Sequence, residues 1–79
     1  MIWTRLKGAR WLAVTDEGDY HIVGVLPAGQ LTLQYGVVYV PRHQAQRPVE
    51  LGKRSQLANA QLLAAVHLRG DYQPEKKHA

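Results

Sequence analysis

Turn-forming residues recur at close intervals through the first half of this 79-residue chain. Gly8, the Asp-Glu-Gly-Asp segment 16–19, the Pro-Ala-Gly-Gln segment 27–30 and Pro41 separate stretches that carry strand-forming residues. Gly, Pro and Asp end strands because each satisfies a particular need of a tight turn. This spacing predicts a meander of short antiparallel strands.

The expected strands cover residues 2–6, 10–15, 20–26 and 31–40, with a short additional strand over 49–51. Alternation within them places side chains on two opposite faces of the sheet. Gly18 is expected to supply positive φ in its turn, and Gly36 is expected to mark a bulge or a bend in the longest strand.

A single helix is predicted after the strands. Ser55 is a suitable N-cap, the helix extends to about Arg69, and Gly70 fits the left-handed C-cap position. The helical period predicts an apolar stripe toward the sheet and places Leu63 in the middle of the opposite, polar face. The members of the predicted stripe are Leu57, Ala58, Leu62, Ala64, Ala65 and Leu68.

The predicted fold class is therefore α+β, an antiparallel sheet of four to five short strands packed by one C-terminal helix. Residues 1–72 are expected to form a single domain, followed by a flexible tail over 73–79. One helix covers one face of a sheet, so the other face is left open. We expect Trp3 or Trp11 to be partly exposed there, together with Val23, Val25 or Val38.

Composition narrows the setting in which the protein acts. The chain has no cysteine, no apolar run of the roughly 20 residues that span a bilayer, and no signal-peptide pattern at its start. We therefore expect a cytoplasmic protein that neither crosses nor binds a membrane.

No catalytic or metal-binding pattern is apparent. The acidic residues Asp16, Glu17 and Asp19 share one exposed turn, and the four histidines lack the spacing of metal ligands. Ser55 is explained by helix capping. We expect neither an enzyme nor a cofactor.

Basic residues outnumber acidic ones by ten to six, for a net charge of +4. Two groups of them could form a basic stripe beside the sheet and neutralise phosphates, although a solvated positive surface explains the charge equally well. A nucleic-acid-binding regulator is thus the alternative function. Its candidate residues are Arg5, Lys7, Arg10, Lys53 and Arg54.

Two resemblances bear on function. Over residues 10–69, the segments Trp11-Leu12-Ala13, Gly18-x-Tyr20-x-Ile22, Leu31-x-Leu33-x-Tyr35 and Leu51-Gly52, with a helix ending His67-Leu68, look like small strand-strand-strand-helix proteins of phages and mobile elements. Some proteins of that size block host defences, as anti-CRISPR proteins do.

The second resemblance is to DNA-binding domains of the ethylene-response-factor type and to the arm-binding domains of tyrosine integrases. It is carried by Arg10-Trp11-x-Ala13, by Val49-Glu50-Leu51-Gly52 and by a helix ending Leu68-Arg69-Gly70. In those families a three-stranded sheet enters the major groove. The strand over 31–40 is more apolar here than in a DNA-reading sheet.

The leading hypothesis is a small non-catalytic protein-binding module, an inhibitor of a host machine. Its partner would be a host protein or protein complex, nucleic acid is the alternative partner, and self-association into a homodimer through the open face is a third option. The candidate protein-binding residues are Trp3, Trp11, Arg42, Arg47 and Leu63.

Overall fold

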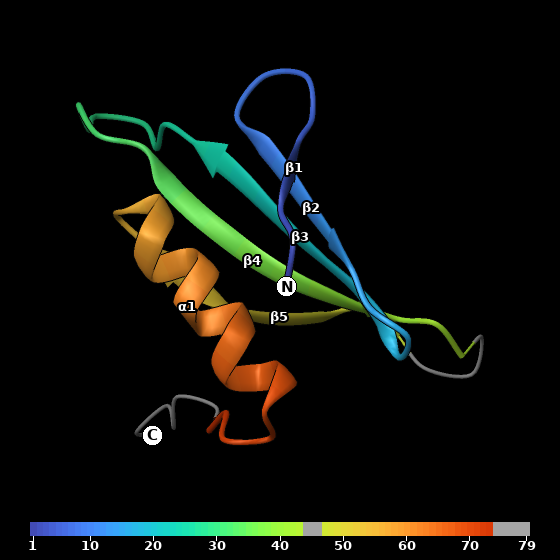
Figure 1. Cartoon of the computed structure of the whole chain (residues 1–79). Coiled ribbons are helices and arrows are strands. Elements are labelled where there is room, and N and C mark those ends of the chain that lie inside the picture. The colour runs from blue at the N-terminus through green and yellow to red at the C-terminus, as the bar shows by residue number, and fades with distance from the viewer. Residues whose placement is uncertain (44–46, 74–79) are drawn as a thin grey trace.

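Five strands and one helix follow one another along the chain in the computed structural model, which describes residues 1–43 and 47–73 (Figure 1). The elements are β1 (Thr4–Arg5), β2 (Arg10–Val14), β3 (Gly18–Val25), β4 (Gln34–Pro41), β5 (Val49–Arg54) and α1 (Leu57–Leu68). Apart from Gln73, the predicted tail lies outside the described residues.

The strands form one antiparallel sheet in the order β1-β2-β3-β4-β5, so every strand pairs with its neighbour in sequence. This confirms the predicted α+β fold, with a meander sheet and one C-terminal helix. The longest strand is shorter than expected: β4 begins at Gln34, and the side chain of Leu31 is 99% exposed in the loop before it.

A bulge interrupts the pairing of β4 with β5. Val37 pairs with Gly52 but Val38 pairs with Glu50, so Leu51 has no partner in the ladder. Gly52 has a φ of 146°, which favours glycine. The Leu51 side chain is buried, and its carbonyl accepts a hydrogen bond from the Tyr72 hydroxyl at 2.8 Å. The bulge therefore lies opposite residues 37 and 38, beside Gly36 and not at it.

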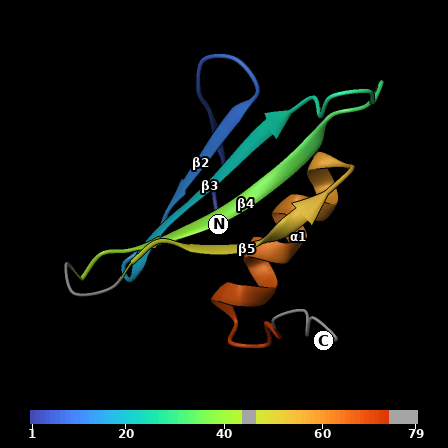
Figure 2. The ribbon, with the colours of Figure 1, turned by 180° about the vertical axis from the view of Figure 1, so that it is seen from behind.

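Helix α1 and the N-terminal segment lie on the same side of the sheet (Figure 1). The view from behind shows β2, β3, β4 and β5 with neither of them in front (Figure 2). We call the side that carries α1 the covered face and the other side the open face. The predicted open face thus exists.

The core lies between the covered face and α1. Ile22 and Val37 are fully buried, and the small side chains of Ala13, Ala60 and Ala64 allow helix and sheet to approach closely. Burial of a side chain such as Ile22 contributes about 1.5–3 kcal/mol. Trp3, Trp11, Tyr35, Tyr39, Leu57 and Tyr72 pack around this centre and are partly exposed.

The predicted orientation of the helix is confirmed for Leu57 and Ala64, which pack against or in the core, and is wrong for the other leucines. Leu63 is only 8% exposed and belongs to the core, whereas Leu62 is 58% exposed. Because apolar residues surround α1 on nearly all sides, their spacing does not determine which side faces the sheet. Contacts decide it: a Cβ added at Gly52 would lie 3.3 Å from the Leu63 Cδ2, so this leucine fills the space above the bulge.

The two ends of α1 match the sequence prediction unequally. Gly70 has a φ of 85°, its N–H donates to His67, and the next N–H, of Asp71, donates to Val66, as in a Schellman motif. At the other end the N-cap residue is Gln56, whose side chain makes no capping hydrogen bond. Ser55 is therefore not the cap, because β5 extends to Arg54 and Ser55 lies at the corner that follows.

Gly18 is needed for space and not for positive φ. Its φ lies outside the positive range, but a Cβ there would lie 2.6 Å from the Val40 carbonyl oxygen and 2.7 Å from the Tyr39 ring. The predicted reason for this glycine is therefore wrong, although the turn itself is where the sequence places it.

Candidate protein-binding face

Strand register decides which side chains reach the open face, because residues paired directly across strands project to the same side. One row across the sheet is Thr4, Leu12, His21, Val38 and Glu50, and the adjacent row is Arg10, Val23, Gly36 and Lys53. The intervening residues, among them Ile22 and Val37, form the buried rows of the covered face.

The middle of the open face is aliphatic. Leu12, Val23, Val38 and Val40 are half-buried by their neighbours in the sheet, and Val14 and Val25 are exposed at its two ends. His21 lies between Leu12 and Val38 in their row and interrupts the aliphatic surface there. A solvated sheet face ordinarily carries mostly polar side chains, and uncovered apolar surface is typical of interaction sites.

Charged residues surround this aliphatic centre. Arg10 and Lys53 stand at opposite ends of one row, on β2 and β5, and Glu50 ends the adjacent row. Within residues 1–43 and 47–73, none of these three forms an ion pair. An apolar centre with a charged rim is the usual anatomy of a protein–protein interface.

The two tryptophans lie on the wrong side of the sheet for the predicted role. Trp11 pairs with the buried Ile22, and Trp3 packs against the core cluster, so both belong to the covered face. The rings of Trp11 and Tyr35 meet edge-on, with their centroids 5.9 Å apart. The guanidinium carbon of Arg5 lies 5.8 Å from the centroid of the Trp11 ring. The prediction that a tryptophan lines the open face is therefore wrong, whereas Val23, Val25 and Val38 do lie there.

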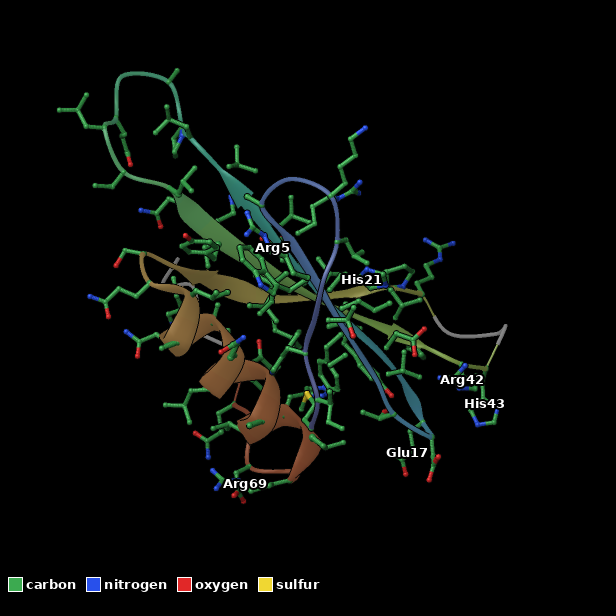
Figure 3. All side chains as sticks on the ribbon, turned by 45° about the horizontal axis from the view of Figure 1, so that its top comes forward. Arg5, Glu17, His21, Arg42, His43 and Arg69 are labelled. Carbon is green, nitrogen blue, oxygen red and sulfur yellow. The ribbon has the colours of Figure 1, made fainter. Side chains whose placement is uncertain are left out.

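Arg42 holds the end of the sheet together. Its guanidinium donates to the Asp19 carboxylate at 2.8 Å and to the Thr15 carbonyl at 2.7 Å, and its backbone N–H donates to the Glu17 carbonyl at 3.0 Å. Figure 3 shows Arg42 and His43 beside the turn that carries Glu17. These bonds give Arg42 a structural role in the chain itself. Arg47, the other predicted arginine, is exposed just before β5.

The five basic residues proposed for nucleic acid do not form one stripe. Arg5 and Arg54 project from the covered side, Arg10 and Lys53 from the open face, and Lys7 lies in the turn between β1 and β2. Figure 3 likewise shows Arg5, Arg42 and Arg69 at three separate places. A continuous phosphate-binding track needs cations along one surface, and this arrangement divides them.

A partly buried polar cluster lies between α1 and the covered face. The Tyr20 hydroxyl and the His67 Nδ1 are 2.7 Å apart, and Tyr39 and Tyr72 pack against the same imidazole ring. Burial, with smaller effects of Tyr39 and Glu17, raises the pKa of Tyr20 to about 12, and burial lowers the pKa of His67. Both shifts favour the neutral forms, and the hydrogen bond between the Tyr20 hydroxyl and His67 Nδ1 links the helix to the sheet.

Other kinds of site find no support in the part of the chain that the structure describes. No three His, Asp or Glu side chains there lie close enough to hold a metal ion. Nor is any helix in those residues long and apolar enough to cross a membrane.

Comparisons with known proteins give no family: no protein-family model, curated protein or solved structure matches the chain. The open face is therefore the main structural indication of function.

Sequence reasoning missed Leu12 and Val40 as residues of the open face. The strands are apolar on both sides, so hydrophobicity alone does not separate the two faces. One signal could have identified the covered face, namely the row that contains Ala13, Tyr20 and Tyr39. A small residue beside large aromatic residues is typical of a surface that packs against a helix.

Proposed function

We propose that this chain is a small non-catalytic protein-binding module that docks on a partner through the open face of its sheet. The observation that carries the proposal is the uncovered aliphatic surface of Leu12, Val23 and Val38, which surrounds His21 and has Arg10, Glu50 and Lys53 at its rim. Apolar side chains gain free energy when a partner protein removes them from water. A nucleic-acid backbone offers them no comparable surface.

In its finer form the proposal is that the module inhibits a host machine, in the manner of small phage and mobile-element proteins. The support for this form is the resemblance in strand and helix order and the small size of the chain. The partner would be a protein or protein complex in the cytoplasm.

The test is capture of a partner by tagged chain in cells of the source organism, with two matched variants. Val38→Glu places a charge in the middle of the open face, and Leu31→Glu places the same charge on an exposed leucine outside it. We expect one set of proteins to be retained by the wild type and by Leu31→Glu and to be lost with Val38→Glu. Identical capture by all three proteins contradicts the proposal, provided that circular dichroism shows Val38→Glu to be folded.

Fluorescence anisotropy with labelled DNA and RNA across a salt series tests the alternative. The division of basic residues between the faces predicts weak binding. Tight binding with a steep salt slope, abolished by Arg10→Ala with Lys53→Ala, would instead support the nucleic-acid function.

A further inference from the structure

Gly36 lies in the middle of the open face without a reason inside the chain. Its φ is not in the positive range, and a Cβ added there would meet nothing closer than the Val23 carbonyl oxygen at 3.9 Å. The other glycines are explained by positive φ or by close packing. They are Gly8, Gly29, Gly52 and Gly70 for the first reason, and Gly18 and Gly24 for the second.

Glycine inside a strand weakens the strand and often marks a place where another chain approaches closely. Gly36 pairs regularly with Val23 on one side and with Lys53 on the other, so the missing side chain leaves a hollow in an otherwise filled row. Two residues further along the same strand and on the same face, Val38 projects from the sheet. Hollow and projection are therefore neighbours on β4.

From this arrangement we infer that the partner on the open face is a second copy of this chain, packed face to face about a two-fold axis. The inference rests on the proposed docking function of that face, and it names a second copy in place of the host protein of the finer proposal as the occupant. The axis lies across the strands, between the row of Gly36 and the row of Val38. This axis stacks each strand on the same strand of the other molecule, with the two running in opposite directions. Val38 of each copy therefore enters the hollow at Gly36 of the other.

The same axis matches the charges of the rim. Lys53 and Glu50 occupy the corresponding rows on β5, so each Lys53 faces Glu50 of the other copy, and two equivalent ion pairs form. Arg10 then lies over Leu12, and His21 over Val23, of the other copy. An axis parallel to the strands would place Arg10 against Lys53 instead, so the charges select one of the two simple arrangements.

The size of the face predicts a reversible dimer. Four strands about 4.8 Å apart, with rows about 6.8 Å apart, give a flat footprint of about 400 Å² per copy. Stable complexes bury about 800 Å² per partner. We therefore expect dissociation at micromolar or higher concentration, and sedimentation equilibrium of the purified full chain from about 5 μM to about 500 μM covers that range.

Gly36→Val fills the hollow and is the most direct variant. Since space is free above Gly36 in the single chain, its melting temperature at low concentration should equal or exceed that of the wild type. The dimer should weaken by about tenfold or more, because the valine occupies the place of Val38 from the other copy. Val25→Ala at the end of the face is the matched control and should change the dissociation constant much less.

Charge reversal tests the register independently of packing. Glu50→Lys and Lys53→Glu should each weaken the dimer by about fivefold, because each replaces two attractive pairs by two repulsive ones. The double variant Glu50→Lys/Lys53→Glu restores both pairs and should recover the wild-type constant. Nonspecific hydrophobic association of the open face cannot produce this recovery in the double variant.

A chain that stays monomeric over the whole range overturns the second copy as occupant. A dimer that is indifferent to Gly36→Val and to both single charge reversals also overturns it, because the contact then lies elsewhere. The docking function is judged separately by Val38→Glu in cells: loss of another protein there, with a monomeric wild type, keeps the function and replaces the occupant.

Discussion

The two faces of the sheet are made by the same strands but by different kinds of side chain. The covered face carries aromatic residues beside alanines, and its buried polar atoms are paired, as the hydroxyls of Tyr20 and Tyr72 show. The open face carries aliphatic residues, a glycine hollow and unpaired charges at its edges. The first arrangement is completed by contacts within the chain, whereas the second leaves apolar side chains uncovered.

The largest expected contrast is between two adjacent residues of β3. Ile22→Ala removes a fully buried side chain and should lower the free energy of unfolding by about 2–4 kcal/mol. Val23→Ala changes the open face and should cost less than about 1 kcal/mol. Urea unfolding of both variants at low protein concentration measures the difference, and equal losses would mean that the open face is part of the core.

A second pair of neighbours tests the orientation of α1. Leu63→Ala should lower the free energy of unfolding by about 2–3 kcal/mol, because Leu63 fills the space above the bulge. Leu62→Ala, at an exposed position, should stay within about 0.5 kcal/mol of the wild type. The reverse order in thermal or urea unfolding would support the helix orientation predicted from sequence.

Removal of one hydroxyl from the covered face has a smaller effect. Tyr20→Phe removes the hydroxyl that is hydrogen-bonded to His67 Nδ1 and should lower the free energy of unfolding by about 1 kcal/mol. Tyr35→Phe is the matched control, since among the described residues the Tyr35 hydroxyl makes no hydrogen bond. Equal effects of the two variants in urea unfolding would show that the Tyr20–His67 bond adds nothing.

The smallest expected effect is a dependence of stability on pH. Burial lowers the pKa of His67 from the ordinary value of 6.5, so the unfolded chain takes up a proton at higher pH than the folded chain does. The free energy of unfolding should therefore fall as the pH drops below about 6.5, until the folded-state pKa is passed.

His67→Asn keeps an acceptor near the Nδ1 position and removes the titration. Between pH 7.5 and about pH 5, above the range of most carboxylates, the variant should show a shallower loss of stability than the wild type. The other histidines are present in both proteins and cancel in the difference. Parallel pH profiles would mean that His67 titrates alike in the folded and unfolded chain.

Much of the fold follows from local chemistry that the sequence displays. Gly, Pro and Asp at the turns predict the meander, and Gly70 predicts the end of the helix, because both depend on a few residues close together in the chain. Two features were not predictable in this way. One is the sheet face that carries Trp3 and Trp11, and the other is the side of α1 that faces the sheet, which includes Leu63. Each depends on long-range packing, and the apolar residues allow either choice.

The candidate site was predictable only in part. An open face follows from one helix on one sheet, and Val23, Val25 and Val38 were assigned to it. Gly36 was noticed as a bulge or bend, but its significance depends on the free space above it and on the register with Lys53, which only the folded sheet shows. Arg42 was assigned to partner binding because the sequence did not reveal its hydrogen bonds to the 15–19 turn. These bonds join residues that are far apart in the chain.

The bulge in β5 also bears on how far association can proceed. An exposed edge strand is a template for adding further strands, and a bulge together with charged side chains discourages such addition. In β5 the ladder is interrupted at Leu51 and Gly52, and Glu50, Lys53 and Arg54 surround the interruption. The opposite edge, β1, is only two residues long. Growth of an open-ended fibre along the sheet is thus disfavoured, and the proposed contact between faces would end at a closed pair of molecules.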